Sequence, residues 1–237
     1  MYSVAAETSL LDQLRTAERA LAESQALLAK MLPDFVIERL KTEPEQPITD
    51  SFADASVLFA DISGFVGIAK KLGNERTVAL LNRLTRAFDA LAARHGVEKI
   101  KTIGDGYMAV AGVPHPQADH CERLARLALD MREAAVRVGR QTGVEIKLRI
   151  GIAAGPVMAG VIGVNKISYD VWGGTVNLAS RLEGLAAADQ ILISHEVKEQ
   201  LGGEFVPSYR GEMQIKGLGK GEAWALEASY AGRGYLH

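Results

Sequence analysis

The chain has 237 residues and a formal net charge of −2 at pH 7, with 48% hydrophobic and 24% charged residues. This balance is typical of a globular protein, and it provides no basic field for binding nucleic acid. The single cysteine, Cys121, excludes an intrachain disulfide, and no apolar run approaches the roughly 20 residues that span a bilayer, so we expect a cytoplasmic location.

Residues 1–32 carry a heptad pattern. Its a and d positions are Leu10, Leu14, Ala17, Leu21, Ser24, Leu28 and Met31. The seam is narrow and the surrounding side chains are polar, which favours a parallel two-stranded coiled coil over a helix packed on its own domain. Pro33 interrupts this helix because proline cannot continue the hydrogen-bond ladder.

Residues 33–52 form a separate element between the coiled coil and the rest of the chain. PDFVIERLK predicts a short second helix, and residues 41–52, with two prolines and mixed charge, predict a linker. We expect a folded domain over 53–227 and a polar tail over 228–237.

From Ala53 onward, strand and helix patterns alternate. Strands are predicted at 56–62, 97–103, 107–113, 146–153, 156–162 and 190–194, and helices at 75–95, 118–140 and 175–185. Gly155 is expected to separate the fourth and fifth strands. The order β-α-β-β-α-β predicts an α+β fold of the ferredoxin-like, split βαβ type, with a mostly antiparallel sheet flanked by helices.

Two aspartates lie where predicted strands turn. Asp61 ends the first strand, and Asp105 lies at the tip of the Gly104-Asp105-Gly106 hairpin. In a split βαβ fold these strands are central neighbours, so the two carboxylates should converge. Neither has a lysine or arginine beside it in the sequence, so their repulsion favours a divalent cation such as Mg²⁺. The alternative is that Asp61 caps a helix and Asp105 only forms a turn.

The residues after Asp61 predict a seat for phosphate. Ile62-Ser63-Gly64-Phe65 leads from the strand end into a helix, so the backbone N–H groups of Gly64 and Phe65 would face an anion.

Asn177 and Arg181 are i and i+4 on a predicted helix and project from one face. An amide beside a guanidinium suits a ligand that carries phosphate, although a solvated pair has the same spacing. The core face of this helix is expected to hold Val176, Leu178, Leu182 and Leu185.

Four motifs, in this order and spacing, resemble the catalytic domain of class III adenylyl and guanylyl cyclases. They are FADISGF, EKIKTIGDGYMAVAGVP, LRIGIAAGPVMAGVIG and YDVWGGTVNLASRLE. The resemblance covers residues 53–226. The preceding LPDFVIERL, behind a coiled coil, resembles the linker that couples sensor domains to these cyclases, which implies an upstream sensor, soluble or in a membrane, as a partner in the native protein.

The resemblance implies roles for individual residues. Asp61 and Asp105 would hold two Mg²⁺ or Mn²⁺ ions, with the carbonyl of Ile62 as a further ligand. The ribose 3′-oxygen would attack the α-phosphorus while Arg181 stabilises the charge on the phosphoryl oxygens and Asn177 orients the ribose.

The resemblance also identifies residues for the base and the terminal phosphates. Lys101 can only donate hydrogen bonds and an ionised Asp170 can only accept them, which fits N1 and N6 of adenine. Guanylyl members of the family carry glutamate and a small residue at these positions, so we expect ATP as substrate. Lys216, in IKGLG, matches the lysine that grips the terminal phosphates.

In this family each site is shared between two catalytic domains. The aspartates would come from one chain, and the base, ribose and phosphate residues from its partner, so a homodimer would have two equivalent sites, regulated through the coiled coil. The alternatives are a guanylyl cyclase and a non-catalytic dimerisation or nucleotide-sensing module. A diguanylate cyclase is disfavoured because GG[DE]EF is absent. Gly174 departs from the asparagine or aspartate usual in the family, which would loosen that helix start.

Overall fold

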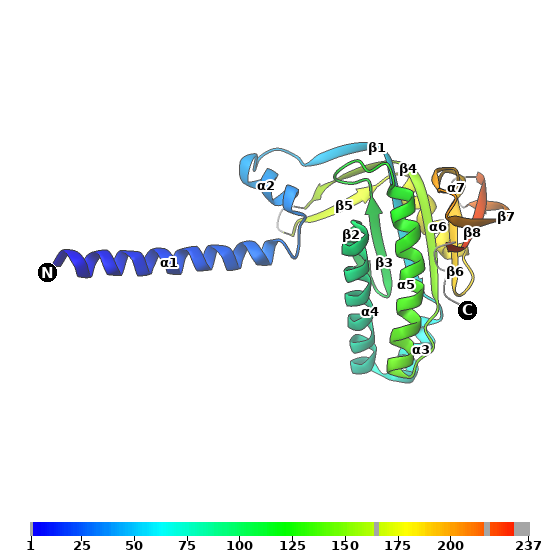
Figure 1. The fold of residues 1–237 in the computed structure, drawn as a ribbon, viewed down its shortest axis with the longest axis horizontal. Helices are drawn as coiled ribbons and strands as arrows, with labels where there is room; N and C mark the ends of the chain where they lie inside the picture. The colour runs from blue at the N-terminus through cyan, green and yellow to red at the C-terminus, as the bar shows by residue number, and fades with distance from the viewer. Residues whose placement is uncertain (1, 164–165, 216–218, 230–237) are drawn as a thin grey trace. The chain divides into compact units, whose positions relative to one another are not determined.

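The computed structural model of the protein describes residues 2–163, 166–215 and 219–229 (Figure 1). The chain divides into two compact units: Met1–Thr49 with Gly160–Asp170, and Asp50–Ala159 with Val171–His237. Within the described residues, none of the helices combines the length and the apolar character that crossing a membrane requires.

The first unit begins with helix α1 (Tyr2–Leu28), followed by a break and helix α2 (Asp34–Thr42). The predicted interruption at Pro33 is confirmed, although α1 already ends at Leu28. Leu14 and Leu21 are 52% and 59% exposed in this single chain. The heptad seam is therefore open to a second helix, and the coiled coil itself stays a prediction.

The rest of the first unit ties α2 to the segment Gly160–Asp170. The ring of Phe35 meets that of Tyr169 edge-on, with 5.3 Å between centroids, and the N–H of Val161 donates to the carbonyl of Ile48 at 2.9 Å. The predicted linker at 41–52 was too long, because α2 extends through Thr42 and β1 begins at Thr49. Ile48 within it is buried.

The second unit is built around a single mixed sheet. Its strands, in spatial order, are β2 (Glu98–Ile103), β3 (Gly106–Ala111), β1 (Thr49–Ile62), β4 (Leu148–Ile162), β6 (Gln190–Ser194), β8 (Gly219–Ser229) and β7 (Phe205–Ile215), and β5 (Ser168–Trp172) pairs with β4. The pairs β1–β3, β2–β3, β6–β8 and β7–β8 are antiparallel, whereas β4 and β6 are parallel. The order β2-β3-β1-β4 is the ferredoxin-like arrangement, so the predicted fold class is confirmed.

The described helices of this unit are α3 (Phe65–Leu72), α4 (Asn74–His95), α5 (His120–Thr142), α6 (Gly174–Leu185) and α7 (His195–Gln200). Helices α4 and α5 lie side by side along the sheet (Figure 1). Their apolar faces share one buried core with Leu58 and Ala60 of β1 and Ile150 and Ile152 of β4.

Helix α6 packs on the face of the sheet opposite to α4 and α5. Neighbouring residues of a strand point to opposite faces, and β4 shows this alternation. Ile150 and Ile152 belong to the core below α4 and α5, whereas Gly151 between them faces α6. A β-carbon at Gly151 would lie 2.2 Å from both the carbonyl oxygen of Ala179 and the backbone nitrogen of Glu183. The absence of a side chain at residue 151 therefore sets how closely α6 approaches β4.

The two strands predicted at 146–153 and 156–162 are one continuous strand, β4, so the expected turn at Gly155 is wrong. Gly155 has φ +145° and a β-carbon there would lie 3.0 Å from Oγ1 of Thr175. The hydroxyl of Thr175 donates to the carbonyl of Pro156 at 2.8 Å. Glycine at this position thus allows the start of α6 to approach the strand.

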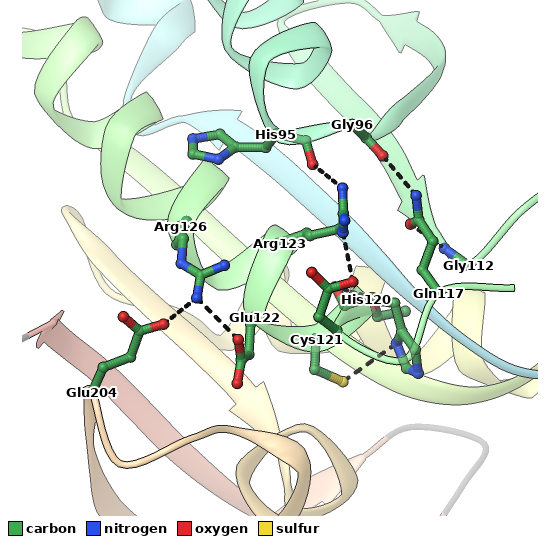
Figure 2. Close-up of polar contacts among 12 residues, drawn as sticks. His95, Gly96, Gly112, Gln117, His120, Cys121, Glu122, Arg123, Arg126 and Glu204 are labelled. Carbon is green, nitrogen blue, oxygen red and sulfur yellow. Dashed lines mark hydrogen bonds and ion pairs between the residues drawn. The ribbon is translucent and has the colours of Figure 1, made fainter.

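Polar side chains fix the start of α5 to its neighbours (Figure 2). Arg123 donates to the carbonyl of His95 at the end of α4, and Gln117 spans from the carbonyl of Gly96 to the N–H of Gly112 after β3. We call Gln117 and Arg123 the α5 clamp. It joins α4, α5 and β3 at the end of β3 opposite to Asp105.

The Gly151 contact gives a stability prediction. Gly151→Ala should lower the free energy of unfolding by about 1–3 kcal/mol, because the new methyl group meets the backbone of α6. Gly184→Ala, within α6 and without atoms inside 4 Å, is the matched control and should be neutral or stabilise by up to about 1 kcal/mol. Urea unfolding followed by circular dichroism measures both, and equal effects would contradict the predicted packing.

Candidate functional site

The structure brings Asp61 and Asp105 together. Strand β1 pairs with β3 up to Ala60 opposite Tyr107, which places Asp61 beside the β2–β3 hairpin. The N–H of Ile62 donates to Oδ2 of Asp105 at 3.3 Å. The N-cap of α3 is Gly64, so Asp61 does not cap that helix. The predicted convergence of the two carboxylates is therefore present in the fold.

The two carboxyl groups have opposite pKa shifts. Burial and the neighbouring Asp61 raise the pKa of Asp105 to about 7. Burial also acts to raise the pKa of Asp61, but hydrogen bonds with Asp105 and Arg149 outweigh it and the net shift is downward. Near neutral pH Asp61 therefore carries a negative charge, whereas Asp105 is close to half protonated.

Arg149 is the cation that the sequence analysis missed. It forms an ion pair with Asp61, and its Nη2 lies 3.3 Å from Oε1 of Glu183 on α6. Strands β1 and β4 are neighbours, and Asp61 and Arg149 both occupy the face opposite to the α4–α5 core. The expectation that only a bound metal balances these carboxylates is therefore wrong for Asp61. The sequence signal for this residue was a charged side chain, Arg149, between two apolar residues of a predicted strand, Leu148 and Ile150.

The residues fit a divalent cation shared with a substrate. The described part of the chain contains no cluster of three or more histidine, cysteine, aspartate or glutamate side chains able to enclose a metal ion. Mg²⁺ typically takes only one or two carboxylates and completes its shell with phosphate oxygens and water. Asp61 and Asp105 match that requirement, because they are two carboxyl groups that meet at one place in the fold.

The predicted phosphate seat lies at the start of α3. Gly64 has φ +71°, which favours glycine, and precedes the first turn of α3. The N–H groups of Gly67 and Ile68 donate to the carbonyl of Gly64, and the N–H of Ser63 donates to the carbonyl of Lys147. Ser63 is thus committed to the protein, and Gly64 and Phe65 stay the candidate contacts.

Asn177 and Arg181 are both exposed on α6, as the spacing predicts. The core face was predicted only in part, because the buried residues are Thr175, Ala179 and Leu182 whereas Leu185 is 46% exposed. At about 100° per residue, Arg181 points about 200° away from Glu183, which contacts Arg149. Within one chain, the amide and guanidinium therefore face away from the aspartates.

The residues predicted to bind the base and the terminal phosphates come from different parts of the chain. Lys101 lies half-buried on β2, opposite Met108 of β3. Asp170 lies half-buried on β5 and belongs to the first compact unit. Lys216 lies outside the described residues.

The comparisons with known proteins agree with the four sequence motifs. Residues 48–228 match the model of the adenylate and guanylate cyclase catalytic domain. An adenylate cyclase of Mycobacterium tuberculosis is 47% identical over 203 residues, which cover 86% of this chain and 46% of that protein. The chain thus spans about half the length of this relative.

Two solved structures share the fold. The guanylate cyclase domain of RhGC from Catenaria anguillulae in complex with GTP has a TM-score of 0.73 and 37% identity, covering 76% of this chain and 99% of that one. The adenylyl cyclase CyaB from P. aeruginosa also has a TM-score of 0.73, with 27% identity, covering 76% of this chain and 96% of that one.

The pKa of Asp105 gives a pH-dependent prediction. Native Asp105 keeps its proton up to about pH 7, whereas the ordinary value is 3.8. The stability that this carboxyl contributes is therefore present at acid pH and lost as the pH rises between these values. In EDTA, Asp105→Asn should gain stability over wild type between pH 5 and pH 8, by about 1 kcal/mol because partial exposure screens the repulsion. Thermal unfolding measures this, with Asp12→Asn on α1 as the control for net charge. A gain independent of pH would contradict the assignment.

Proposed function

Because the chain belongs to the family of adenylate and guanylate cyclase catalytic domains, we propose that it converts ATP to 3′,5′-cyclic AMP and pyrophosphate. The observation that carries this proposal is the meeting of Asp61, at the end of β1, with Asp105 in the β2–β3 hairpin, while Asn177 and Arg181 are exposed on α6 of the same chain.

The proposed reaction needs positioning and charge stabilisation rather than covalent chemistry by the protein. Asp61 and Asp105, with the carbonyl of Ile62, would hold two Mg²⁺ or Mn²⁺ ions, which lower the pKa of a ribose hydroxyl and neutralise the triphosphate. The backbone N–H groups of Gly64 and Phe65 bind phosphate oxygens at the start of α3.

The second group of residues acts on the ribose and the reacting phosphate. Asn177 orients the ribose so that its 3′-oxygen is in line with the α-phosphorus and the bond to pyrophosphate. Arg181 stabilises the charge that develops on the α-phosphoryl oxygens, and Lys216 binds the terminal phosphates. The bond from the 3′-oxygen to phosphorus forms as the bond to the leaving pyrophosphate breaks.

The proposed enzyme is a homodimer whose sites lie between two chains. Arg181 points away from Glu183 and hence from the aspartates of its own chain, which supports a site completed by the partner's α6. The exposed leucines of α1 support a parallel coiled coil that brings the two chains together. A sensor that acts through α1 fits this arrangement, and it would regulate activity by changing how the half-sites meet.

ATP is the proposed substrate because of Lys101 and Asp170. A donor facing N1 and an acceptor facing the N6 amino group fit adenine, and both are mismatched to guanine. GTP is the second candidate, since the RhGC guanylate cyclase domain at 37% identity was solved with GTP bound.

The shared site gives a complementation prediction. Wild type should form a cyclic nucleotide from ATP with Mn²⁺ or Mg²⁺, whereas Asp61→Ala and Arg181→Ala should each be inactive. An equal mixture of the two variants should recover up to about a quarter of wild-type activity, because half of the dimers contain one intact site. Chromatography of the products measures this. Wild type that yields no cyclic nucleotide from ATP or GTP would exclude the enzyme, and an inactive mixture would exclude the shared site.

The base contacts give a specificity prediction. The double variant Lys101→Glu/Asp170→Ser should prefer GTP over ATP. Glutamate accepts a hydrogen bond from the N1–H of guanine, and the serine hydroxyl, unlike an ionised aspartate, can also donate one. The ratio of kcat/KM for the two nucleotides measures the change. An unchanged ratio would show that other residues select the base.

A further inference from the structure

The pairing of β2 with β3 shifts by one residue within the sequence Lys99-Ile100-Lys101. Lys99 lies opposite Ala109 of β3, whereas Lys101 lies opposite Met108, the immediate neighbour of Ala109. Two steps along β2 therefore match one step along β3, which is the arrangement of a β-bulge with Ile100 as the additional residue.

The bulge sends the two lysines to opposite faces of the sheet. In a regular strand, residues two positions apart point to the same face. Residues that lie opposite each other on paired strands also share a face, and Ala109 belongs to the core beneath α4 and α5. Lys99 therefore lies on the α4 face. Lys101 shares the other face with Met108, and this is the face on which Asp61 lies.

Asp89 of α4 holds Lys99 on the α4 face. Nζ of Lys99 lies 2.8 Å from Oδ1 and 2.9 Å from Oδ2 of Asp89, so the ammonium group contacts both carboxylate oxygens. The hydroxyl of Tyr107 on β3 donates to Oδ1 of the same carboxylate at 3.0 Å. Burial and the neighbouring Asp89 raise the pKa of Tyr107, so the phenol keeps the proton that it donates. Asp89 thus connects α4 to both strands beside the bulge.

The surroundings of this anchor restrict its geometry. Tyr107 is 2% exposed, and its ring meets that of Phe88 edge-on with 5.7 Å between centroids. Nζ of Lys99 lies 5.4 Å from the centroid of the Tyr107 ring, which is within the range of a cation–π interaction. The ion pair itself is 30% exposed at Lys99 and 44% at Asp89, and pairs of this exposure add little to stability. A role in geometry is therefore favoured over a role in stability.

We propose that Asp89 is a positioning residue for recognition of the base. By holding Lys99 on the α4 face, it fixes the bulge and leaves Lys101 as the lysine of this pair that faces the base. Without the anchor, the register set at the hairpin would continue and bring Lys99 opposite Val110, on the face of Lys101. A second ammonium group there would repel Lys101 and displace it from N1 of adenine. The inference rests on the proposed function for this contact, and Asp89 touches neither nucleotide nor metal in the scheme.

The competing explanation is that Asp89 only fastens α4 to the sheet. Loss of such a fold contact would lower activity with ATP and GTP alike. Displacement of Lys101 would instead act mainly on ATP, because guanine offers no acceptor at N1. The ratio of kcat/KM for the two nucleotides, measured on one preparation, separates these explanations because the fraction of folded protein cancels.

The first experiment measures the register of β2 by cross-strand nuclear Overhauser effects. Asp89→Lys should lose the proximity of Lys99 to Ala109, because the two ammonium groups repel each other. The charge swap Asp89→Lys/Lys99→Asp should bring residue 99 back opposite Ala109. Glu133→Lys, an exposed position on α5 with the same change in net charge, is the control and should keep the wild-type register. A wild-type register in Asp89→Lys would overturn the proposal.

The second experiment measures base selectivity in the same variants. Asp89→Lys should lower the ratio of kcat/KM for ATP over GTP by about 10-fold, and the charge swap should recover most of this loss. Glu133→Lys should match wild type. An unchanged ratio in Asp89→Lys would overturn the proposal. Wild type without turnover would count against the proposed function instead, and the register experiment, which needs no activity, would then decide the role of Asp89 in the bulge.

The third experiment tests whether Asp89 acts through Lys101. In a Lys101→Met background, Asp89→Lys should change the ATP to GTP ratio by less than about twofold, because the side chain that it displaces is already absent. Effects of the two substitutions that multiply independently would show that Asp89 influences the base by another route, and would overturn the proposal.

Discussion

The organisation of this catalytic unit depends on keeping acidic side chains together beside an apolar core. Asp61, Asp105 and Glu183 come from β1, the β2–β3 hairpin and α6, and burial acts against the charge of each one. Arg149 balances part of that charge from the neighbouring strand. Burial, together with the neighbouring Asp61, raises the pKa of Asp105 to about 7. A divalent ion would stabilise the ionised form of both aspartates, which is the physical basis of the proposed binding of metal together with a nucleotide.

The order of strands and the meeting of Asp61 with Asp105 could be predicted from the sequence. Both follow from local signals, namely alternating hydrophobicity, the Gly104-Asp105-Gly106 turn and the β-α-β-β-α-β order. The contact of Asp61 with Arg149 could not be predicted in the same way, because it joins residues 88 positions apart. It depends on β4 lying beside β1 and on which face of each strand is turned away from the core.

Glycines and helix ends account for the other differences. Gly155 was predicted to separate two strands and Gly151 lay inside a predicted strand, whereas the structure shows that both glycines let α6 approach β4. Leu185 was assigned to the core by periodicity alone, although it is the last residue of α6 and is exposed. Periodicity describes a helix surface well in its middle, whereas the last turn depends on where the chain leaves the helix.

The α5 clamp has a consequence for how this domain tolerates sequence change. Its acceptors at residues 95 and 96 are main-chain carbonyls, which no substitution can delete, whereas the donating side chains of Gln117 and Arg123 can be lost in a single step. Residue 96 is restricted for a separate reason, since its φ is +63° and a β-carbon there would lie 2.5 Å from Nη1 of Arg123. Substitution at residues 96, 117 and 123 would thus disturb this part of the domain, whereas the hydrogen bond from Arg123 imposes no side-chain requirement at residue 95.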